Sequence, residues 1–398
     1  MGIMTGKSRI VLDLTPANGL TPANGLTPAN GSFGDAAVPR GAPRGWDLLG
    51  TVPVPLRHCV RDGIADLVAR HRADGGPPLK CCFPMGQGGR SPFDRLRFIR
   101  TLDDYPNMLV SSEDGKAFNR RFYQRHVAGG AFTAGQPQGV APAFTEAGLV
   151  DPDGRIGVFA VAPFVLLIDQ RRLNGLPAPR RWADLMDPSY RGQVVFGGWR
   201  REGERRYSHF NSFFLLCMAR EFGLDGLARL VRNVPGLIHS AQMPRLAGTD
   251  ASPGGLYVLP WSLADMCPRR DETRVVWPED GALAYPLWLT VKTAHRDRLD
   301  VLLRHFHGAD LGRLLNRNRY PALCPTLPPA LPAGARLKWP GWDLVRHPAT
   351  PKLLQAACRI FLEAQEGLGA QEDRDVRDGP PRPANREPAS REEIRACA

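Results

Sequence analysis

Two glycine-containing segments of the sequence have the composition of anion-binding loops. The first, GQGGRSPF (86–93), follows an apolar run, and its serine precedes a proline. Serine commonly caps a helix and proline fits the first helical position, so a helix is predicted to start here. A helix N-terminus offers free N–H groups and a positive dipole end to an anion. The predicted anion-binding residues, which a tight strand–helix turn would also require, are Gly86, Gln87, Gly88 and Ser91.

The second segment, GGWRREGERRYSHFNS (197–212), lies between a predicted strand and a predicted helix. Trp199 could stack on a ligand, and an arginine could pair with an anion through two hydrogen bonds. One of His209, Asn211 and Ser212 is expected to cap the helix. A solvated basic loop would equally account for the arginines. The residues predicted to bind the ligand are Gly198, Trp199, Arg200, Arg201, Asn211 and Ser212.

A third candidate lies in GLYVLPWSLADMC (255–267), where Trp261 and Ser262 follow a predicted strand. An apolar wall with one hydroxyl suits a small organic ligand or an oxyanion. Glu279 and Asp280 provide an acidic pair, for which a turn is the simpler interpretation.

The sequence contains no G-x-S-x-G, HExxH, Walker or GxGxxG motif, so no catalytic residue, metal site or cofactor is predicted. None of the eight cysteines forms a CxxC pair. We therefore expect buried free thiols in a reducing compartment.

Two long apolar runs, each interrupted by a proline, must position these segments. They are 155–169, with Pro163, and 282–292, with Pro286. A proline removes a ladder N–H, so an ordinary central strand is not expected to contain one. Between the runs lies a second α/β set, with strands at 193–198 and 255–261 and helices at 211–223 and 226–234. The pattern predicts paired hinge strands between two lobes; two unrelated edge strands are the alternative.

The rest of the chain completes a domain organisation around these two runs. Helices are predicted at 57–73, 114–129, 295–307 and from Thr350 to about Gly369, with a strand at 79–85. The predicted domains are a disordered tail with LTPANG repeats (1–45), an N-terminal helical extension (46–78), lobe 1 (79–163 and 289–368), lobe 2 (164–288) and a disordered charged tail (369–398).

The net charge of +12 indicates either general solubility or attraction of anionic ligands. Nucleic acid is not an expected partner, because the arginines of 200–206 alternate with Glu202 and Glu204. No apolar run approaches the roughly 20 residues of a membrane span, and no signal peptide is evident in the chain as given.

A motif within 173–198 resembles a known family. Its pattern is W-x-D-L-x-D-P-x-Y-x-G, and the matching residues are Trp182, Asp184, Leu185, Asp187, Pro188, Tyr190 and Gly192. This pattern resembles family 1 extracellular solute-binding proteins, the substrate-binding components of ABC importers, best known for ferric iron. The resemblance implies an α/β protein with the type II periplasmic-binding-protein fold, in which two lobes joined by a double-strand hinge close on a ligand. It also implies an ABC permease as partner, a monomer, and a periplasmic or extracytoplasmic location, with a cytoplasmic location as the alternative.

The sequence departs from the ferric-binding members where they carry two neighbouring tyrosines. Here Pro260, Trp261 and Ser262 occupy that position, and Tyr257 is a single phenol within a strand. We therefore expect an anionic or metal-complex ligand rather than direct ferric coordination. A cytosolic ligand sensor on the same fold is one alternative. A thiol-dependent enzyme is another, because Cys81-Cys82-Phe83 is similar to part of the cysteine cluster of thiamine-pyrimidine synthases.

Overall fold

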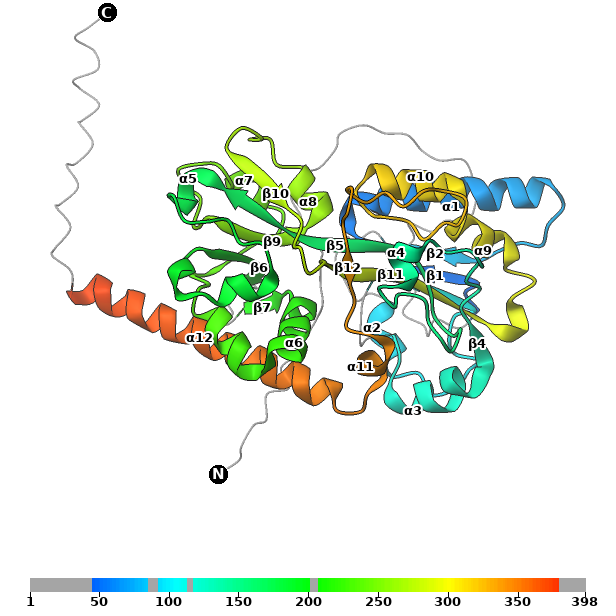
Figure 1. Ribbon diagram of the computed structural model, residues 1–398. Helices are drawn as coiled ribbons and strands as arrows, with labels where there is room; N and C mark the ends of the chain where they lie inside the picture. Colours follow the sequence, from blue (N-terminus) through cyan, green and yellow to red (C-terminus); the bar gives the residue numbers. More distant parts are fainter. Residues whose placement is uncertain (1–44, 85–91, 113–116, 201–206, 379–398) are drawn as a thin grey trace, which may run out of the picture.

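A single mixed sheet runs through the whole protein and carries helices on both faces (Figure 1). The computed structural model describes residues 45–84, 92–112, 117–200 and 207–378, with side chains described except at 199–200, 207–210 and 366–378. The order of its main strands is β2-β1-β3-β11-β5-β9-β6-β7. This α/β architecture is the predicted type II arrangement, two lobes joined by long shared strands.

Lobe 1 is built on three short parallel strands and the far half of a long one. Parallel to one another run β1 (Leu48–Gly50), β2 (Cys81–Cys82) and β3 (Met108–Ser111). The long strand β11 (Ala282–Lys292) pairs antiparallel with β3 and, at its end, with β4 (Phe132–Thr133).

Lobe 2 has a similar plan. Strands β6 (Val194–Arg200), β8 (Leu237–Ile238) and β9 (Leu256–Pro260) are parallel, and β7 (Tyr207–Phe210) pairs antiparallel with β6. Strand β5 (Gly157–Asp169) pairs antiparallel with β9 and with β10 (Thr273–Val276).

Strands β5 and β11 cross between the lobes and pair antiparallel with each other from Leu283 opposite Phe164 to Leu289 opposite Gly157. Every residue of both strands is buried. The prediction of two paired crossing strands is confirmed, with bounds within two residues of the predicted ones.

The register explains how both strands tolerate their prolines. Pro163 lies opposite Ala284, and Pro286 lies opposite Val161. The Val161 N–H points away from β11, since it donates to the Pro321 carbonyl at 3.0 Å. Successive N–H groups of a strand point alternately toward its two neighbours, so the nitrogens of Pro163 and Pro286 also point away from the opposite crossing strand. The β5–β11 ladder therefore loses no hydrogen bond at either proline.

Each outer edge also changes its partner near the proline. On β5, pairing with β9 begins at Phe164; on β11, pairing with β3 begins at Trp288, two residues after Pro286. A missing N–H is therefore tolerated at both positions.

Helices cover both lobes. Lobe 1 carries α1 (Val54–Ala73), α2 (Phe93–Leu96), α3 (Arg120–Phe122), η1 (Tyr123–Ala131), α4 (Pro142–Thr145), η4 (Thr293–His295), α9 (Asp300–Phe306) and α10 (Ala309–Arg317). Lobe 2 carries α5 (Gln170–Leu173), η2 (Trp182–Met186), η3 (Pro188–Tyr190), α6 (Ser212–Val231), α7 (Met243–Leu246) and α8 (Trp261–Asp265). The predicted break between two helices after residue 223 is present as a bend within α6, where Gly223 has a φ of 71°.

A third crossing follows α10. The chain forms β12 (Leu337–Lys338) beside the start of β11, then α11 (Trp342–Arg346) and α12 (Thr350–Asp378). Arg346 of α11 pairs with Asp151 at 2.5 Å on the lobe 1 side. Helix α12 instead packs along α6, and Phe361 contacts the Phe196 ring of β6 with centroids 5.4 Å apart. The assignment of all of 289–368 to lobe 1 is therefore wrong for α12, which covers lobe 2 (Figure 1).

Several predicted elements have other bounds in the structure. The range 46–78 is more than a helical extension, because β1 lies inside the lobe 1 sheet between β2 and β3. The helix predicted at 114–129 begins only at Arg120, where Asn119 caps it. Helix α12 continues past Gly367 and Gly369 to Asp378, so the first part of the predicted disordered tail is helical.

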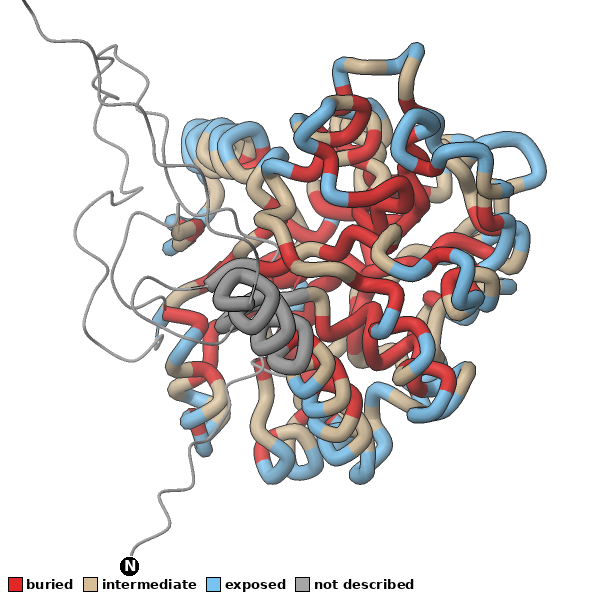
Figure 2. Tube along the Cα trace, turned by 90° about the vertical axis from the view of Figure 1, so that its left-hand side faces the viewer, coloured by how far each residue is buried: buried red, intermediate tan, exposed pale blue. Residues whose placement is uncertain are grey.

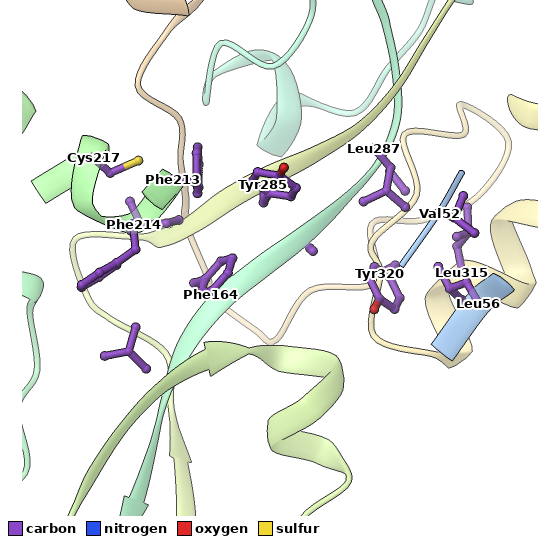
Figure 3. Close-up of a cluster of buried hydrophobic side chains, with 14 of the residues drawn as sticks. Val52, Leu56, Phe164, Phe213, Phe214, Cys217, Tyr285, Leu287, Leu315 and Tyr320 are labelled. Carbon is purple, nitrogen blue, oxygen red and sulfur yellow. The ribbon is translucent and has the colours of Figure 1, made fainter. Parts of the chain in front are cut away.

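Buried residues concentrate on the central strands, and exposed residues lie on the outer helices and turns (Figure 2). One apolar cluster follows the crossing strands from α6, with Phe213, through Phe164 and Tyr285 to Leu56 of α1 (Figure 3). The two lobes therefore share a continuous core along β5 and β11.

Candidate functional site

The parallel strands of each lobe point toward the other lobe. Strand β5 runs from lobe 1 into lobe 2, and the antiparallel β9, with its parallel neighbour β6, runs back toward lobe 1. By the same argument, β3 is antiparallel to β11 and runs, with β1 and β2, toward lobe 2. Ligands of open α/β sheets bind outside the carboxyl ends of parallel strands. All three predicted ligand-binding segments follow such ends.

The N-terminus of α6 is the best defined of these segments. The Asn211 side chain caps the helix, because its Oδ1 accepts a hydrogen bond from the Phe214 N–H at 3.1 Å. The Asn211 N–H donates to the Gly197 carbonyl at 3.3 Å, which ties the cap to β6. Gly198, which follows Gly197 in β6, is buried and pairs with Phe210 of β7.

Ser212, the first residue of α6, has a relative exposure of 0%. Its hydroxyl has no hydrogen-bond partner in the described structure. A buried hydroxyl without a partner costs free energy, so this position is unusual for a purely structural serine.

The lobe 1 counterpart is much shorter. Helix α2 has only four residues, and the residue before it is Pro92, which makes no side-chain cap. The prediction of Pro92 at the first helical position is therefore wrong, and the cap predicted at Ser91 falls on a residue that the structure does not describe. Gly86, Gln87, Gly88 and Ser91 lie outside the described residues.

The basic hairpin of lobe 2 is described only in its backbone. Trp199 pairs with His209 and Arg200 with Tyr207, with a register shift between the two pairs. The side chains of Trp199 and Arg200, and the whole of Arg201, lie outside the description.

The structure places Trp261 and Ser262 at the start of α8, against the turn that follows α10. The Ser262 hydroxyl donates to the Tyr320 hydroxyl oxygen at 3.1 Å. The Arg319 guanidinium lies 4.9 Å from the Trp261 ring centroid and 3.1 Å from the Asp265 carboxylate. These two predicted ligand residues therefore also join lobe 2 to the α10 turn.

Sequence reasoning missed Arg319 and Tyr320. Arg319, two residues after the end of α10, lies in the left-handed region with a φ of 64°, which is uncommon for a residue with a side chain. No local signal marked this turn, since it lacks the glycine that usually occupies such a position.

The structure does not present Tyr257 or Tyr320 as a phenolate. The Tyr257 hydroxyl lies 2.7 Å from the Ser252 hydroxyl. Burial raises the pKa of Tyr257 to about 12 and that of Tyr320 to about 12. Both phenols are therefore buried and protonated, and each is hydrogen-bonded to a serine, Tyr257 to Ser252 and Tyr320 to Ser262. In the described part of the chain, no three His, Cys, Asp or Glu side chains gather closely enough to hold a metal ion.

The cysteines suggested for a thiol enzyme are not activated. Burial raises the pKa of the Cys81 thiol to about 12 and that of Cys82 to about 11, so neither forms the thiolate that reacts at neutral pH. All seven described cysteines are free. The expectation of buried thiols is met at five of them, whereas Cys59 is exposed and Cys82 is half-buried.

Glu279 and Asp280 serve a turn, as interpreted from the sequence. Glu279 pairs with Arg180. Asp280 accepts a hydrogen bond from the Trp182 N–H at 3.3 Å, and the Trp182 indole donates to the Gly281 carbonyl at 2.8 Å. These contacts hold the motif that suggested the family against the start of β11.

None of the helices in the described ranges combines the length and the apolar character needed to cross a bilayer.

Comparison with known proteins supports the same architecture. Residues 103–348 match the sequence model of the family described as "Bacterial extracellular solute-binding protein". No curated protein matches the chain by sequence.

Solved structures match over most of the chain at low identity. A Bordetella ferric binding protein is similar with 14% identity and a TM-score of 0.51, covering 79% of this chain and 99% of its own. A Trichodesmium protein (IdiA, FutA), solved in complex with iron and citrate ligands, has 13% identity, a TM-score of 0.53 and coverages of 80% and 100%. An ABC transporter structure from Clostridium perfringens has 11% identity, a TM-score of 0.53 and coverages of 79% and 99%. At these identities the likeness shows the fold.

Proposed function

The chain belongs to the bacterial extracellular solute-binding protein family, and we propose that it captures a small solute between its lobes and delivers it to an ABC permease. The observation that carries this proposal is the N-terminus of α6. There the Asn211 cap, tied to Gly197, lies where the parallel pairing of β6 with β8 and β9 ends, and the Ser212 hydroxyl beside it has no partner among the described residues.

We propose an anionic solute or an anionic metal complex as the ligand. A helix N-terminus attracts negative charge through its free N–H groups and its dipole. The predicted arginines at 200 and 201 would add charge-assisted hydrogen bonds to the same solute. The burial of Tyr257 and Tyr320, each already hydrogen-bonded to a serine, supports a ligand held by hydrogen bonds rather than a bare ferric ion held by phenolates.

The family supports a binding role for the chain, and an extracytoplasmic location belongs to the proposal. A monomer is also part of it, because a two-lobed binding protein closes around its ligand within one chain. Closure would occur by bending at β5 and β11, a hinge motion of the type used by many binding proteins.

The test is a binding screen on the full chain, with phosphate, molybdate, citrate, ferric citrate, phosphonates and polyamines as solutes. Thermal unfolding would report binding, since a solute at a hundredfold excess over its Kd stabilises the folded state by about 2.7 kcal/mol. Small-angle scattering would report closure as a smaller radius of gyration. An anion that raises the melting temperature and compacts the protein is expected. A flat response to every solute would contradict the proposal.

A matched pair of serine variants localises the response. Ser212→Ala removes the hydroxyl at the start of α6, whereas Ser189→Ala removes one on exposed η3. We expect the first to weaken binding and the second to leave it unchanged. Equal binding by both variants would place the solute elsewhere.

A further inference from the structure

Four aromatic side chains meet where α6 faces the third crossing. The Phe213 ring lies edge-on to Tyr285 of β11, with centroids 4.8 Å apart, and stacks on Trp339 at 6.1 Å with an interplanar angle of 25°. Trp339 in turn contacts Trp342 at 5.6 Å. We call Phe213, Tyr285, Trp339 and Trp342 the aromatic cluster. Phe213 and Tyr285 point toward each other between α6 and β11 in Figure 3.

The aromatic cluster joins the two lobes. Phe213 is the second residue of α6 in lobe 2. Trp342 packs in the lobe 1 core, in the same cluster of buried residues as Phe93 at the start of α2. Arg346, one turn after Trp342, holds α11 to lobe 1 through Asp151 and Asp153, at 2.5 Å each. Opening of the lobes would therefore separate Phe213 from Trp342.

Three buried hydrogen-bond donors on these segments have no acceptor among the described residues. They are the indole N–H groups of Trp339 and Trp342 and the hydroxyl of Ser212, which precedes Phe213 in α6. Trp342 is 7% exposed and Ser212 0% exposed. Buried indole N–H groups usually find a partner. The buried Trp182 does so, donating to the Gly281 carbonyl, and the more exposed Trp277 donates to the Arg336 carbonyl.

We propose that these three donors receive the acceptor oxygens of the solute, and that the aromatic cluster contacts its apolar body. The solute class is then an organic carboxylate with a flat or branched apolar part. This inference rests on the proposed function and narrows its ligand from any small anion to an amphipathic one.

Unpaired buried donors cost free energy, and a solute that accepts their hydrogen bonds would remove that cost. A buried donor without an acceptor destabilises a protein, and a site with several of them rejects any molecule that cannot accept hydrogen bonds. Aromatic walls with a few placed polar groups are also the usual lining of small-molecule sites. Acceptors on the solute would satisfy all three donors at once when the lobes close.

The experiment compares Trp339→Phe and Trp342→Phe, which delete the indole N–H and keep an aromatic ring, with Trp277→Phe as the control. In the ligand-free full chain, thermal unfolding checks that all three variants fold, because each loses ring volume. Only Trp277→Phe also loses a bonded donor, whereas Trp339→Phe and Trp342→Phe lose donors without a partner among the described residues. The affinities of the variants then decide the inference.

Binding is then measured by calorimetry with phenylacetate, acetate and phenethylamine, which separate the ring from the carboxylate. We expect phenylacetate to bind at least tenfold more tightly than either other probe, and each cluster variant to lose about tenfold in affinity for it, with Trp277→Phe unchanged. An anion that binds wild type and cluster variants equally would overturn this inference and leave the proposed function standing. No binding by any solute of either panel would overturn both.

Discussion

The two predicted anion sites share a sequence signal and differ in structure. Both place glycines after a strand and a capping residue before a helix. In lobe 2 the helix continues for eleven residues before the bend at Gly223, and Asn211 caps it. In lobe 1 the helix ends after four residues and starts after an uncapped proline. Glycines followed by a capping residue therefore predict where a helix starts. The length of that helix determines the strength of the helix dipole at a bound ligand.

The largest expected effect compares two buried phenylalanines at these helix starts. Phe213→Ala and Phe93→Ala should each reduce the free energy of unfolding by about 3–5 kcal/mol, the usual range for a buried phenylalanine. Only Phe213→Ala should also weaken solute binding, because Phe213 lies in the aromatic cluster. Urea unfolding and thermal shift with the solute measure the two effects. Equal losses of solute affinity in the two variants would contradict the expected difference between the helix starts of the two lobes.

Acid should destabilise lobe 1 through His307, which lies at the end of α9 near Gly157. Burial lowers the pKa of the His307 imidazole to about 4, although its backbone contact with Ala134 opposes the change. The unfolded chain binds the proton near its ordinary pKa of about 6.5, so stability is fully present above pH 6.5 and falls as the pH drops toward 4.

The loss through His307 should approach about 3 kcal/mol at the acid end. Urea unfolding of wild type and His307→Asn between pH 7 and 4 measures it. The variant should show a shallower decline over that range. Identical pH profiles would exclude His307 as the cause.

Removing the cap of α6 should have a smaller effect on stability. Asn211→Ala deletes the side-chain bond to Phe214 and should cost about 1 kcal/mol of unfolding free energy. Pro92→Ala, at the matching position of α2, removes no cap bond, but it removes a buried ring and loosens the unfolded chain, which should cost about 0.4–1 kcal/mol. Chemical unfolding measures these losses together with that of Asn211→Ser, which keeps a capping oxygen and should lose only a few tenths of a kcal/mol. A loss in Asn211→Ser as large as that in Asn211→Ala would show that the cap bond is not the cause.

The smallest effect is expected at Ser212. Ser212→Ala removes a hydroxyl that has no partner, so stability should stay within about 0.5 kcal/mol of wild type or rise. Thermal unfolding of the ligand-free protein measures this. A clear loss would reveal a structural bond for that hydroxyl.

The crossing strands could be predicted from sequence because they are long and apolar on both faces. Residues 155–169 and 282–292 were expected as a pair, and the structure pairs Gly157–Asp169 with Ala282–Lys292. Their prolines were read as bends, and the structure adds that both occupy positions where no β5–β11 bond is lost. Gly223 likewise marked the bend in α6, since only glycine adopts a positive φ freely.

Other features depend on contacts that no local pattern reports. Strand β1 has three residues, too few for a periodicity, and is defined by its two neighbours. Helix α12 was placed on the wrong lobe because its packing on α6 is a long-range fact. Trp339 and Trp342 escaped notice for the same reason, since the third crossing brings them to a helix more than 120 residues earlier in the chain.

The outward-facing proline nitrogens have a kinetic consequence. Pro163 and Pro286 carry no N–H, so bending the strands there breaks no hydrogen bond from these two nitrogens to an outer neighbour. We therefore expect the bend to concentrate at the two prolines and the barrier to lobe movement to be low. We expect the association rate to be limited by diffusion of the solute, with the lobes already exchanging between arrangements many times before each encounter.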